Sequence, residues 1–292
     1  FIKGAFSQYL SPTVIDQIVA NPDMLKLGGE KREMTPFFSD IQGFSTISEG
    51  LTPEELVQLL NEYLTAMCDI ISSHHGTIDK FEGDAIIAFW GAPLDLPNHA
   101  TVACYATIEM QKRSVELRKM LREQNRPLLY TRMGLNSGPV VVGNMGSAER
   151  MDYTMMGDVV NLAARLEGAN KFYKTYSMIS GSTYELVKDD VDSRQLDIIR
   201  VVGKNEPVPV HELLARKNET SSEMSGVVEQ YLKGLKLYQD RNFADAVKEF
   251  EKVLTIDPDD GPSQTYVKRC AMFIETPPEK DWDGVFTFTE KG

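Results

Sequence analysis

The sequence predicts an α+β fold: an antiparallel-rich sheet with helices on one face, followed by a small helical unit. After residue 34 the segments read strand, helix, two strands, helix and two strands. Consecutive strands without an intervening helix favour antiparallel pairing, whereas a doubly wound parallel sheet would alternate strand and helix. A polar stretch without aromatic residues, Lys217 to Ser225, marks a boundary before the helical unit.

Composition narrows the class of protein. The chain has 292 residues, of which 42% are hydrophobic, so it can bury a substantial core. Its net charge of −12, with no basic patch to offset it, argues against nonspecific binding to nucleic acid or anionic membranes. Its three cysteines are widely spaced, as is typical of a reducing compartment. We therefore expect a cytoplasmic chain that contacts a membrane, if at all, only through an upstream region.

The first 33 residues predict a helix and then a loop. Ser11 followed by Pro12 is a good helix start, and apolar residues follow at helical spacing. Residues 25–30 predict a loop. The helix could pack on the domain or connect it to something upstream; we assign residues 1–33 as a helical connector.

The stretch from Phe37 to Phe44 predicts a strand, an acid, a glycine turn and a helix. Asp40 at the strand end can be aimed at a cation, although a simple turn-forming acid is the alternative. Gly43 lets the next N–H groups approach an anion closely. Pro36 removes a ladder donor, so the strand starts at Phe37, or its first residues lie at an edge or bulge.

A long helix and a hairpin come next. Thr52 begins the helix with a capping box closed by Glu55. Residues 77–81 and 85–90 then predict two strands joined around a glycine turn. That turn ends in Asp84, so Asp40 and Asp84 could share a divalent cation if their strands are neighbours.

The remaining segments complete the sheet. Residues 98–123 predict a helix, residues 128–135 and 140–143 a second hairpin, residues 158–171 a helix, and residues 177–214 a strand, a short helix and a strand pair. Within one of these helices, Asn161 and Arg165 are four residues apart and share a face. An amide and a fixed cation on one face suit orienting a sugar and neutralising a phosphate.

Beyond a linker at 217–226, residues 227–275 predict a helical segment. Its spacing resembles a single tetratricopeptide repeat, with a departure at Gln230, where an aromatic residue is usual. One repeat cannot bury its own face, so it must dock on a neighbour, on a further helix at 263–274 or on another protein. The tail, 276–292, is either flexible or an aromatic strap over the repeat.

Together the three stretches around Asp40, Asp84 and Asn161 resemble the class III nucleotidyl cyclases, and the resemblance covers residues 34 to 214. It implies a ferredoxin-like sheet over a catalytic domain at 34–216. It also implies a homodimer with active sites at its interface, acting as the signalling output of a larger sensor protein.

The resemblance also implies a metal and phosphate site. Asp40 and Asp84, with the Ile41 carbonyl, would hold two Mg²⁺ or Mn²⁺ ions. The amides around Gly43 and Phe44 would bind the β- and γ-phosphates.

Further residues take roles by the same resemblance. Arg132 would contact the terminal phosphate, with a structural ion pair as the alternative. The partner subunit would supply Asn161 to position the ribose and Arg165 to stabilise the transition state. Lys204 would bind the triphosphate, although Val202 stands where the first lysine of that motif is usual.

Two positions select the base in this family, and here they are Lys80 and Thr154. Lys can donate to a ring nitrogen of adenine, and Thr can accept from its 6-amino group as well as donate. The pair favours ATP, and the implied reaction is attack of the ribose 3′-OH on the α-phosphorus, giving 3′,5′-cyclic AMP and pyrophosphate. Asp40, water or a substrate oxygen could accept the proton.

Two other classes of function stay open. The domain could be a degenerate cyclase that binds nucleotide only for regulation, although the presence of both acids with Asn161 and Arg165 argues against this. Alternatively, the helical segment could be the working part, as an adaptor for a protein partner.

Overall fold

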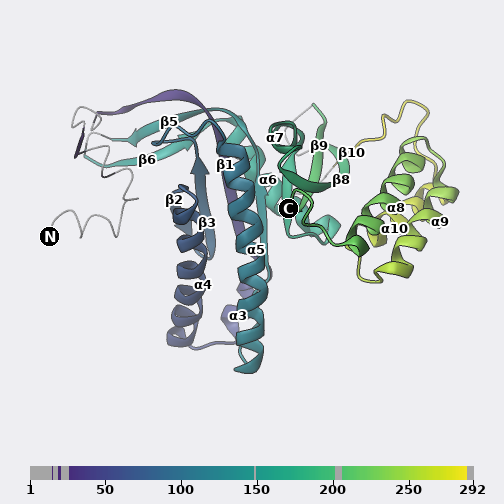
Figure 1. The fold of residues 1–292 in the computed structure, drawn as a ribbon, viewed down its shortest axis with the longest axis horizontal. Coiled ribbons are helices and arrows are strands. Elements are labelled where there is room, and N and C mark those ends of the chain that lie inside the picture. Colours follow the sequence, from purple (N-terminus) through teal and green to yellow (C-terminus); the bar gives the residue numbers. More distant parts are fainter. Residues whose placement is uncertain (1–14, 16–18, 21–25, 148, 201–205, 288–292) are drawn as a thin grey trace.

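In the computed structural model, residues 15, 19–20, 26–147, 149–200 and 206–287 are described. The long strand β1 (Gly28–Ile41) crosses the centre of the molecule (Figure 1). The elements that follow it are α3 (Phe44–Glu49), α4 (Pro53–Ser73), β2 (Thr77–Glu82), β3 (Ala85–Trp90), α5 (His99–Glu123), β4 (Thr131–Leu135), β5 (Gly138–Gly146), β6 (Met151–Met156), α6 (Asp158–Tyr173), β7 (Ser177–Ser180), α7 (Gly181–Val187), β8 (Val191–Arg200), β9 (Val208–Arg216), α8 (Ser222–Gln239), α9 (Phe243–Ile256), α10 (Gly261–Glu275) and β10 (Phe286–Thr287).

The main sheet has the strand order β10-β8-β9-β7-β4-β1-β3-β2. Its pairs are antiparallel except β4 with β7 and β8 with β10, which confirms an antiparallel-rich α+β sheet. The capping box of α4 is present, with the Thr52 amide donating to Glu55 and the Glu55 amide to the Thr52 hydroxyl. The β2–β3 hairpin also forms as expected.

Helices cover both faces of the sheet, so the prediction of helices on one face is wrong. Met133 and Leu135 of β4 join the core with α4 and α5. Gly134, between them, lies against the backbone of α6. Because successive strand residues point to opposite faces, α6 lies on the face opposite α4 and α5.

The predicted hairpin of residues 128–135 and 140–143 is also wrong, because β4 and β5 do not pair with each other. Both run antiparallel to β1 along the same edge: β4 pairs with residues 37–41 and β5 with residues 28–34. Along one edge, the long strand β1 therefore pairs first with β5 and then with β4. Beyond β4, β5 and β6 continue as a two-stranded arm (Figure 1).

Strand β1 begins earlier than predicted and runs through Pro36. It starts at Gly28, inside the predicted loop and connector. Pro36 faces Phe89 on one side, and on the other it falls between the segments paired with β5 and β4. The missing N–H therefore lies where β1 changes partner. Of the predicted helix at 11–19, only Ile15 and Val19 are described, and both are helical.

The helical unit docks on its own chain, as the neighbour alternative predicted. Tyr231, Phe250 and Tyr266 of α8, α9 and α10 share one core with Leu166 of α6 and Leu196 of β8. In Figure 1 this unit lies beside the β8–β9 end of the sheet. Gly234 packs against the Phe250 ring, where an added Cβ would lie 2.8 Å from the nearest ring carbon. Membership of the tetratricopeptide class stays a prediction.

Buried charges cross this junction. Arg194 of β8 contacts Asp260 at 2.7 Å and Glu212 at 2.6 Å. Arg269 of α10 contacts Asp197 of β8 at 2.7 Å, and the Tyr173 hydroxyl donates to the same carboxylate at 2.5 Å. The sheet with its covering helices and the helical unit therefore form one packed body.

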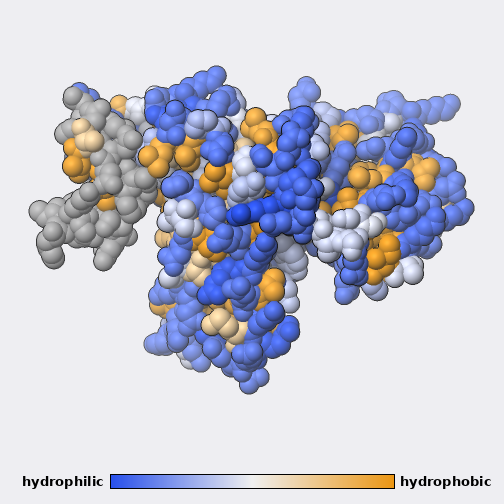
Figure 2. Space-filling model, in the orientation of Figure 1, coloured by the Kyte–Doolittle hydropathy of each residue, from blue (hydrophilic) through white to orange (hydrophobic). Residues whose placement is uncertain are grey.

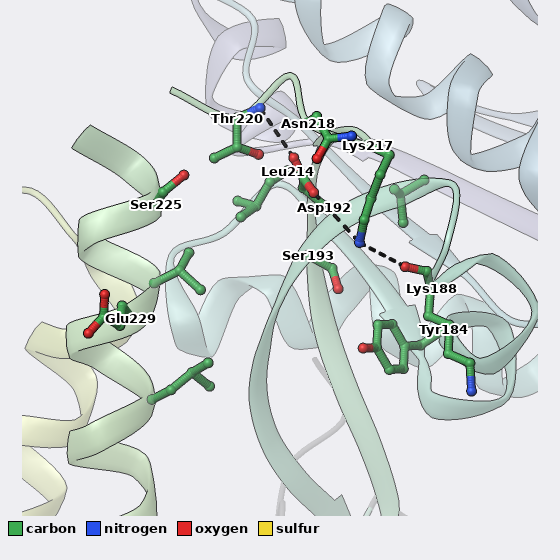
Figure 3. Close-up of a pocket in the computed structure, with 13 residues that line it drawn as sticks. Tyr184, Lys188, Asp192, Ser193, Leu214, Lys217, Asn218, Thr220, Ser225 and Glu229 are labelled. Atoms are coloured by element: carbon green, nitrogen blue, oxygen red, sulfur yellow. Dashed lines mark hydrogen bonds and ion pairs between the residues drawn. The ribbon is translucent and has the colours of Figure 1, made fainter. Parts of the chain in front are cut away.

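The predicted linker is ordered. Helix α8 begins at Ser222, inside the range 217–226, and the residues before it are held by hydrogen bonds. Lys217 Nζ donates to the Lys188 carbonyl, and the Thr220 amide donates to Asp192 (Figure 3). The tail acts as a strap: Trp282 packs on Tyr238, and β10 pairs with β8.

Candidate active site

Asp40 and Asp84 meet at the same end of neighbouring strands. β1 and β3 pair up to Ser39 opposite Ile86, which places Asp40 beside the turn that carries Asp84. The Ile41 amide donates to Asp84 Oδ2 at 2.9 Å. Burial, with the nearby charge of Asp40, raises the pKa of Asp84 to about 6.

This pair of acids suits a divalent cation. Carboxylate oxygens are hard donors, and a cation between them would relieve the repulsion that raises the Asp84 pKa. Across the described ranges, no cluster of three or more His, Cys, Asp or Glu residues could hold a metal. The two acids alone are below that number, and the Ile41 carbonyl as a further donor stays a prediction.

Arg132 of β4 lies directly opposite Asp40 and is engaged by two acids. Its Nη2 donates to Asp40 Oδ2 at 2.9 Å. Its Nε lies 2.9 Å from Glu167 Oε1, close enough for an ion pair, although neither atom makes a hydrogen bond. Burial raises the pKa of Glu167 to about 7, while the Arg132 charge lowers it. This is the ion-pair alternative for Arg132; the phosphate role stays a prediction.

Gly43 has the backbone conformation that its predicted role requires. Its φ of 70° is left-handed, and no atom lies within 4 Å of the position that a Cβ would occupy. Gly43 caps α3, whose first residue is Phe44, without a side-chain hydrogen bond. The turn is therefore open to a ligand on its outer side.

Lys80 and Thr154 are brought together by Asp79. The Thr154 hydroxyl on β6 donates to Asp79 Oδ2 at 2.6 Å, and Lys80 Nζ lies 3.6 Å from Asp79 Oδ1. The Asp79 side chain is only 3% exposed, and burial raises its pKa while Thr154 and Lys80 lower it. The two residues predicted to recognise the base therefore both contact the same carboxylate, that of Asp79.

Asn161 and Arg165 lie on α6, which approaches the sheet closely because of Gly134. A Cβ there would lie 2.2 Å from the Glu167 amide and 2.5 Å from the Ala163 carbonyl. Asn161 is exposed, and Arg165 Nη1 is buried without a hydrogen-bond partner. Among the described residues, no hydrogen bond or ion pair links Asn161 or Arg165 to Asp40 or Asp84. Lys204 lies outside the described residues.

Sequence reasoning missed Asp79 and Glu167. Asp79 falls at a register shift between Ile78 and Lys80, so it is the extra residue of a bulge in β2. Its position beside Lys80 was the available signal, but the bulge that turns it inward is not visible in the residue pattern. Glu167 lies two residues after Arg165, and only the packing of α6 on β4 brings it to Arg132.

A separate cleft of about 600 Å³ lies between the sheet and α8, with Tyr184, Lys188, Asp192, Lys217 and Glu229 among its lining residues (Figure 3). Asp192 there contacts Lys217 and the Thr220 amide. Of the predicted site residues that the structure describes, none lines this cleft. The two acids at the end of β1 and in the turn before β3, Asp40 and Asp84, therefore remain the predicted site.

None of the helices in the described ranges combines the length and the apolar character that a bilayer span requires. Figure 2 shows a largely hydrophilic surface on which hydrophobic groups are scattered, some over the arm and others over the helical unit. Val141 of β5 and Met156 of β6, opposite one another in register, are 41% and 58% exposed. The arm thus offers an apolar surface.

Comparison with known proteins gives a family match. The model of the adenylate and guanylate cyclase catalytic domain matches residues 29–214. Adenylate cyclase 1 of Rhizobium meliloti is 39% identical over 184 residues, which are 63% of this chain and 28% of that protein. The terminal-differentiation-specific adenylate cyclase of Dictyostelium discoideum is 30% identical over 280 residues, 94% of this chain and 13% of that protein. The chain thus spans less than a third of either relative.

Solved structures give the same picture. The adenylyl cyclase CyaB from P. aeruginosa is 39% identical, with a TM-score of 0.61, over 67% of this chain and all of that chain. The guanylyl cyclase Cya2 is 36% identical, with a TM-score of 0.62, over 67% of this chain and 98% of that chain.

Proposed function

This chain belongs to the family of adenylate and guanylate cyclase catalytic domains, and from that premise we propose that it is an adenylate cyclase. It converts ATP to 3′,5′-cyclic AMP and pyrophosphate, at sites shared between two copies of the chain. Similarity to both an adenylyl and a guanylyl cyclase structure leaves the base undecided, so the choice of ATP rests on this chain's own residues.

The observation that most supports ATP as the substrate is that Lys80 and Thr154 both contact the Asp79 carboxylate. An ammonium can only donate, which suits a ring-nitrogen acceptor of adenine. A threonine hydroxyl beside it can accept from the 6-amino group. Guanine presents a carbonyl and an N–H at the same two positions and fits this pair less well.

The other residues take roles that their geometry permits. Asp40, Asp84 and the Ile41 carbonyl would hold two Mg²⁺ or Mn²⁺ ions, which would lower the pKa of the ribose hydroxyl and stabilise the polyphosphate leaving group. The open turn at Gly43 and Phe44 would receive the β- and γ-phosphates. Because the reacting groups belong to one substrate molecule, positioning supplies much of the rate.

Arg165 and Asn161 complete the site from the partner copy. Asn161 would orient the ribose, and Arg165 would meet negative charge that develops at the phosphorus, an effect commonly worth about 3 kcal/mol. The buried Arg165 Nη1, which lacks a partner within the described residues, supports a role toward a ligand. The exposed apolar pair on the arm, Val141 and Met156, supports a dimer.

A nucleotide-product assay tests the proposal. Purified protein with Mn²⁺ should form cyclic AMP from ATP, and much less cyclic GMP from GTP, with products separated by chromatography. Equal use of both nucleotides would refute the choice of ATP. No cyclic product from either would favour a degenerate cyclase that only binds nucleotide.

A further inference from the structure

Asp79 occupies an unusual position between the two residues that face the base. It is the extra residue of the β2 bulge, so its side chain turns inward, while Lys80 resumes the register opposite Ile87. Its carboxylate is almost fully buried and accepts the Thr154 hydroxyl at 2.6 Å. Its second oxygen, Oδ1, makes no hydrogen bond within the described residues and lies 3.6 Å from Lys80 Nζ.

This hydrogen bond decides what Thr154 can offer a ligand. A hydroxyl has one proton and two lone pairs, so a free threonine can either donate or accept. Once the proton points to Asp79, only lone pairs remain. Thr154 is then an acceptor, which fits an amino group and repels a carbonyl oxygen.

The same carboxylate acts on Lys80. Its Oδ1 lies 3.6 Å from Lys80 Nζ, and this attraction holds the ammonium near Thr154. Lys80 therefore presents a donor and Thr154 an acceptor, side by side. That order matches N1 and the 6-amino group of adenine, and it is reversed relative to N1–H and the 6-oxo group of guanine or hypoxanthine.

We propose that Asp79 is a specificity-determining residue, which fixes the hydrogen-bond polarity of Thr154 and so selects a 6-amino purine. Asp79 does not touch the substrate in this role; it acts through Thr154 and Lys80. The inference rests on the proposed adenylate cyclase function and goes beyond it by assigning the residue that sets the polarity of the base pocket.

The test compares ATP with inosine triphosphate, which differs only at N1 and position 6. In Asp79→Asn, the single amide oxygen should face the Lys80 ammonium, so the NH₂ group faces Thr154. The hydroxyl proton of Thr154 is then available to the ligand, and Thr154 can donate to it as well as accept. The ratio of kcat/KM for ATP to that for inosine triphosphate should fall by about tenfold or more. Asp79→Leu, which frees the hydroxyl to rotate, should also lower the ratio.

Two controls separate polarity from charge and from structure. Asp152 is an exposed acid on the same strand as Thr154, and its charge acts on Asp79. Asp152→Asn removes this charge and should leave the ratio of kcat/KM values unchanged. Thr154→Ser keeps the hydroxyl and should keep the ratio, whereas Thr154→Val should lower it. In the Thr154→Val background, Asp79→Asn should have no further effect on the ratio, because the group through which it acts is gone.

Each outcome has a meaning. An equal loss of activity with both nucleotides in the Asp79 variants would mean a structural role and overturn the inference. If the Asp79 variants fail to fold, an unchanged ratio in Thr154→Val would overturn it as well. A wild-type protein that makes no cyclic AMP from ATP would refute the proposed function itself. A preference for ATP that survives in both Asp79 variants but is lost in Thr154→Val would refute only the role of Asp79.

Discussion

At the residue scale, burial sets the protonation of several side chains. Burial is the main cause that raises the pKa of Asp84 to about 6 and that of Glu167 to about 7. The same effect acts in the opposite direction on His211 of β9, whose pKa it lowers to about 4. The His211 ring stacks on Tyr184 with centroids 4.0 Å apart, in a position where only the neutral form is well accommodated.

His211 should make the protein lose stability in mild acid. The unfolded chain takes up a proton near pH 6.5, while the folded chain resists until about pH 4. The stability that neutral His211 contributes is therefore present above pH 6.5 and lost as the pH falls through this window, by at most about 3 kcal/mol. Asp84 and Glu167, whose pKa values are raised, change the stability in the opposite direction over the same window, so the measurement is a difference between two proteins. The free energy of urea unfolding of His211→Phe, which keeps the stacking, should rise relative to that of the wild type as the pH falls from 7 to 4.5.

The matched control for this prediction is His75→Asn. His75 is exposed and has a left-handed backbone, which asparagine tolerates. This variant should keep the pH dependence of the wild type. A His211→Phe protein with the same pH dependence as the wild type would contradict the assigned cause.

Sequence alone identified the residues whose roles depend on motif and strand position. Asp40 and Asp84 follow from two acids at strand ends, and their meeting follows from adjacent strands. Asp79 could not be assigned, because an inward position in β2 requires a bulge that inserts one residue. Glu167 could not be assigned either, because its partner Arg132 is 35 positions away, on a strand that only packing brings to α6.

At the element scale, the approach of α6 to the sheet depends on one position. Gly134 of β4 lies under the helix, where backbone atoms of Ala163 and Glu167 occupy the space of a side chain. The same helix carries Asn161 and Arg165. The placement of these two residues is therefore coupled to the contact at Gly134.

Replacing Gly134 with alanine should displace α6. An added Cβ would lie 2.2 Å from a backbone nitrogen, so the helix must move, at a cost of about 1–3 kcal/mol or more. Activity, measured at a temperature at which the variant is still folded by circular dichroism, should fall further than stability does, because Asn161 and Arg165 move with the helix.

Gly226→Ala is the control at this scale. Gly226 lies in α8, and nothing is within 4 Å of its Cβ position. This variant should be as active as the wild type and up to about 1 kcal/mol more stable, because alanine is a better helix former. Full activity in Gly134→Ala would contradict the coupling of the contact to the site.

Elements with a strong hydrophobic periodicity were predicted correctly from the sequence. The predictions were wrong where strand pairing depends on residues far apart in the chain. The helix at Pro53–Ser73 has a capping box and a regular apolar stripe, and it forms as expected. The order of β4 and β5 along β1 could not be read from either segment, because it depends on the length of β1. Strand β6 was not predicted, since its sequence, Met151–Met156, lies outside the main sheet on the arm.

At the scale of the whole molecule, the helical unit is part of the catalytic body. Arg269 of α10 is buried, contacts Asp197 of β8 and lies with its guanidinium 3.8 Å from the centroid of the Phe286 ring. Deleting residues 217–292 would strip this partner from Asp197 and expose the shared core. We therefore expect the deletion to destabilise the sheet at β8 instead of cleanly isolating an adaptor.

Removing the Arg269 side chain should be strongly destabilising. Arg269→Ala leaves the Asp197 carboxylate buried without its cation, which costs about 3–5 kcal/mol. Thermal unfolding should show the loss as one cooperative transition for the entire chain. Lys233→Ala, which breaks the exposed pair with Glu229, should unfold like the wild type. Separate transitions for the catalytic and helical segments would contradict a single packed body.

The shared site can be tested by mixing inactive copies. Asp40→Ala and Arg165→Ala should each be nearly inactive, because each change breaks both sites of a homodimer. Mixed dimers have one intact site, so an equal mixture should regain about a quarter of the wild-type rate. The control mixture is Asp40→Ala with Asp84→Ala, which break the same half of the site and should not recover. No recovery in the first mixture would refute the shared site.

The ionic contacts between β8 and α10 also constrain how such a chain can be recombined. A chimera that takes the helical unit from a relative and joins it at residue 217 would separate Arg194 from Asp260 and Asp197 from Arg269. A working exchange has to move β8 together with the helices, although the two are distant along the chain. The better junction for such a chimera therefore lies before Val191, where β8 begins. It does not lie at residue 217, where the composition of the chain changes.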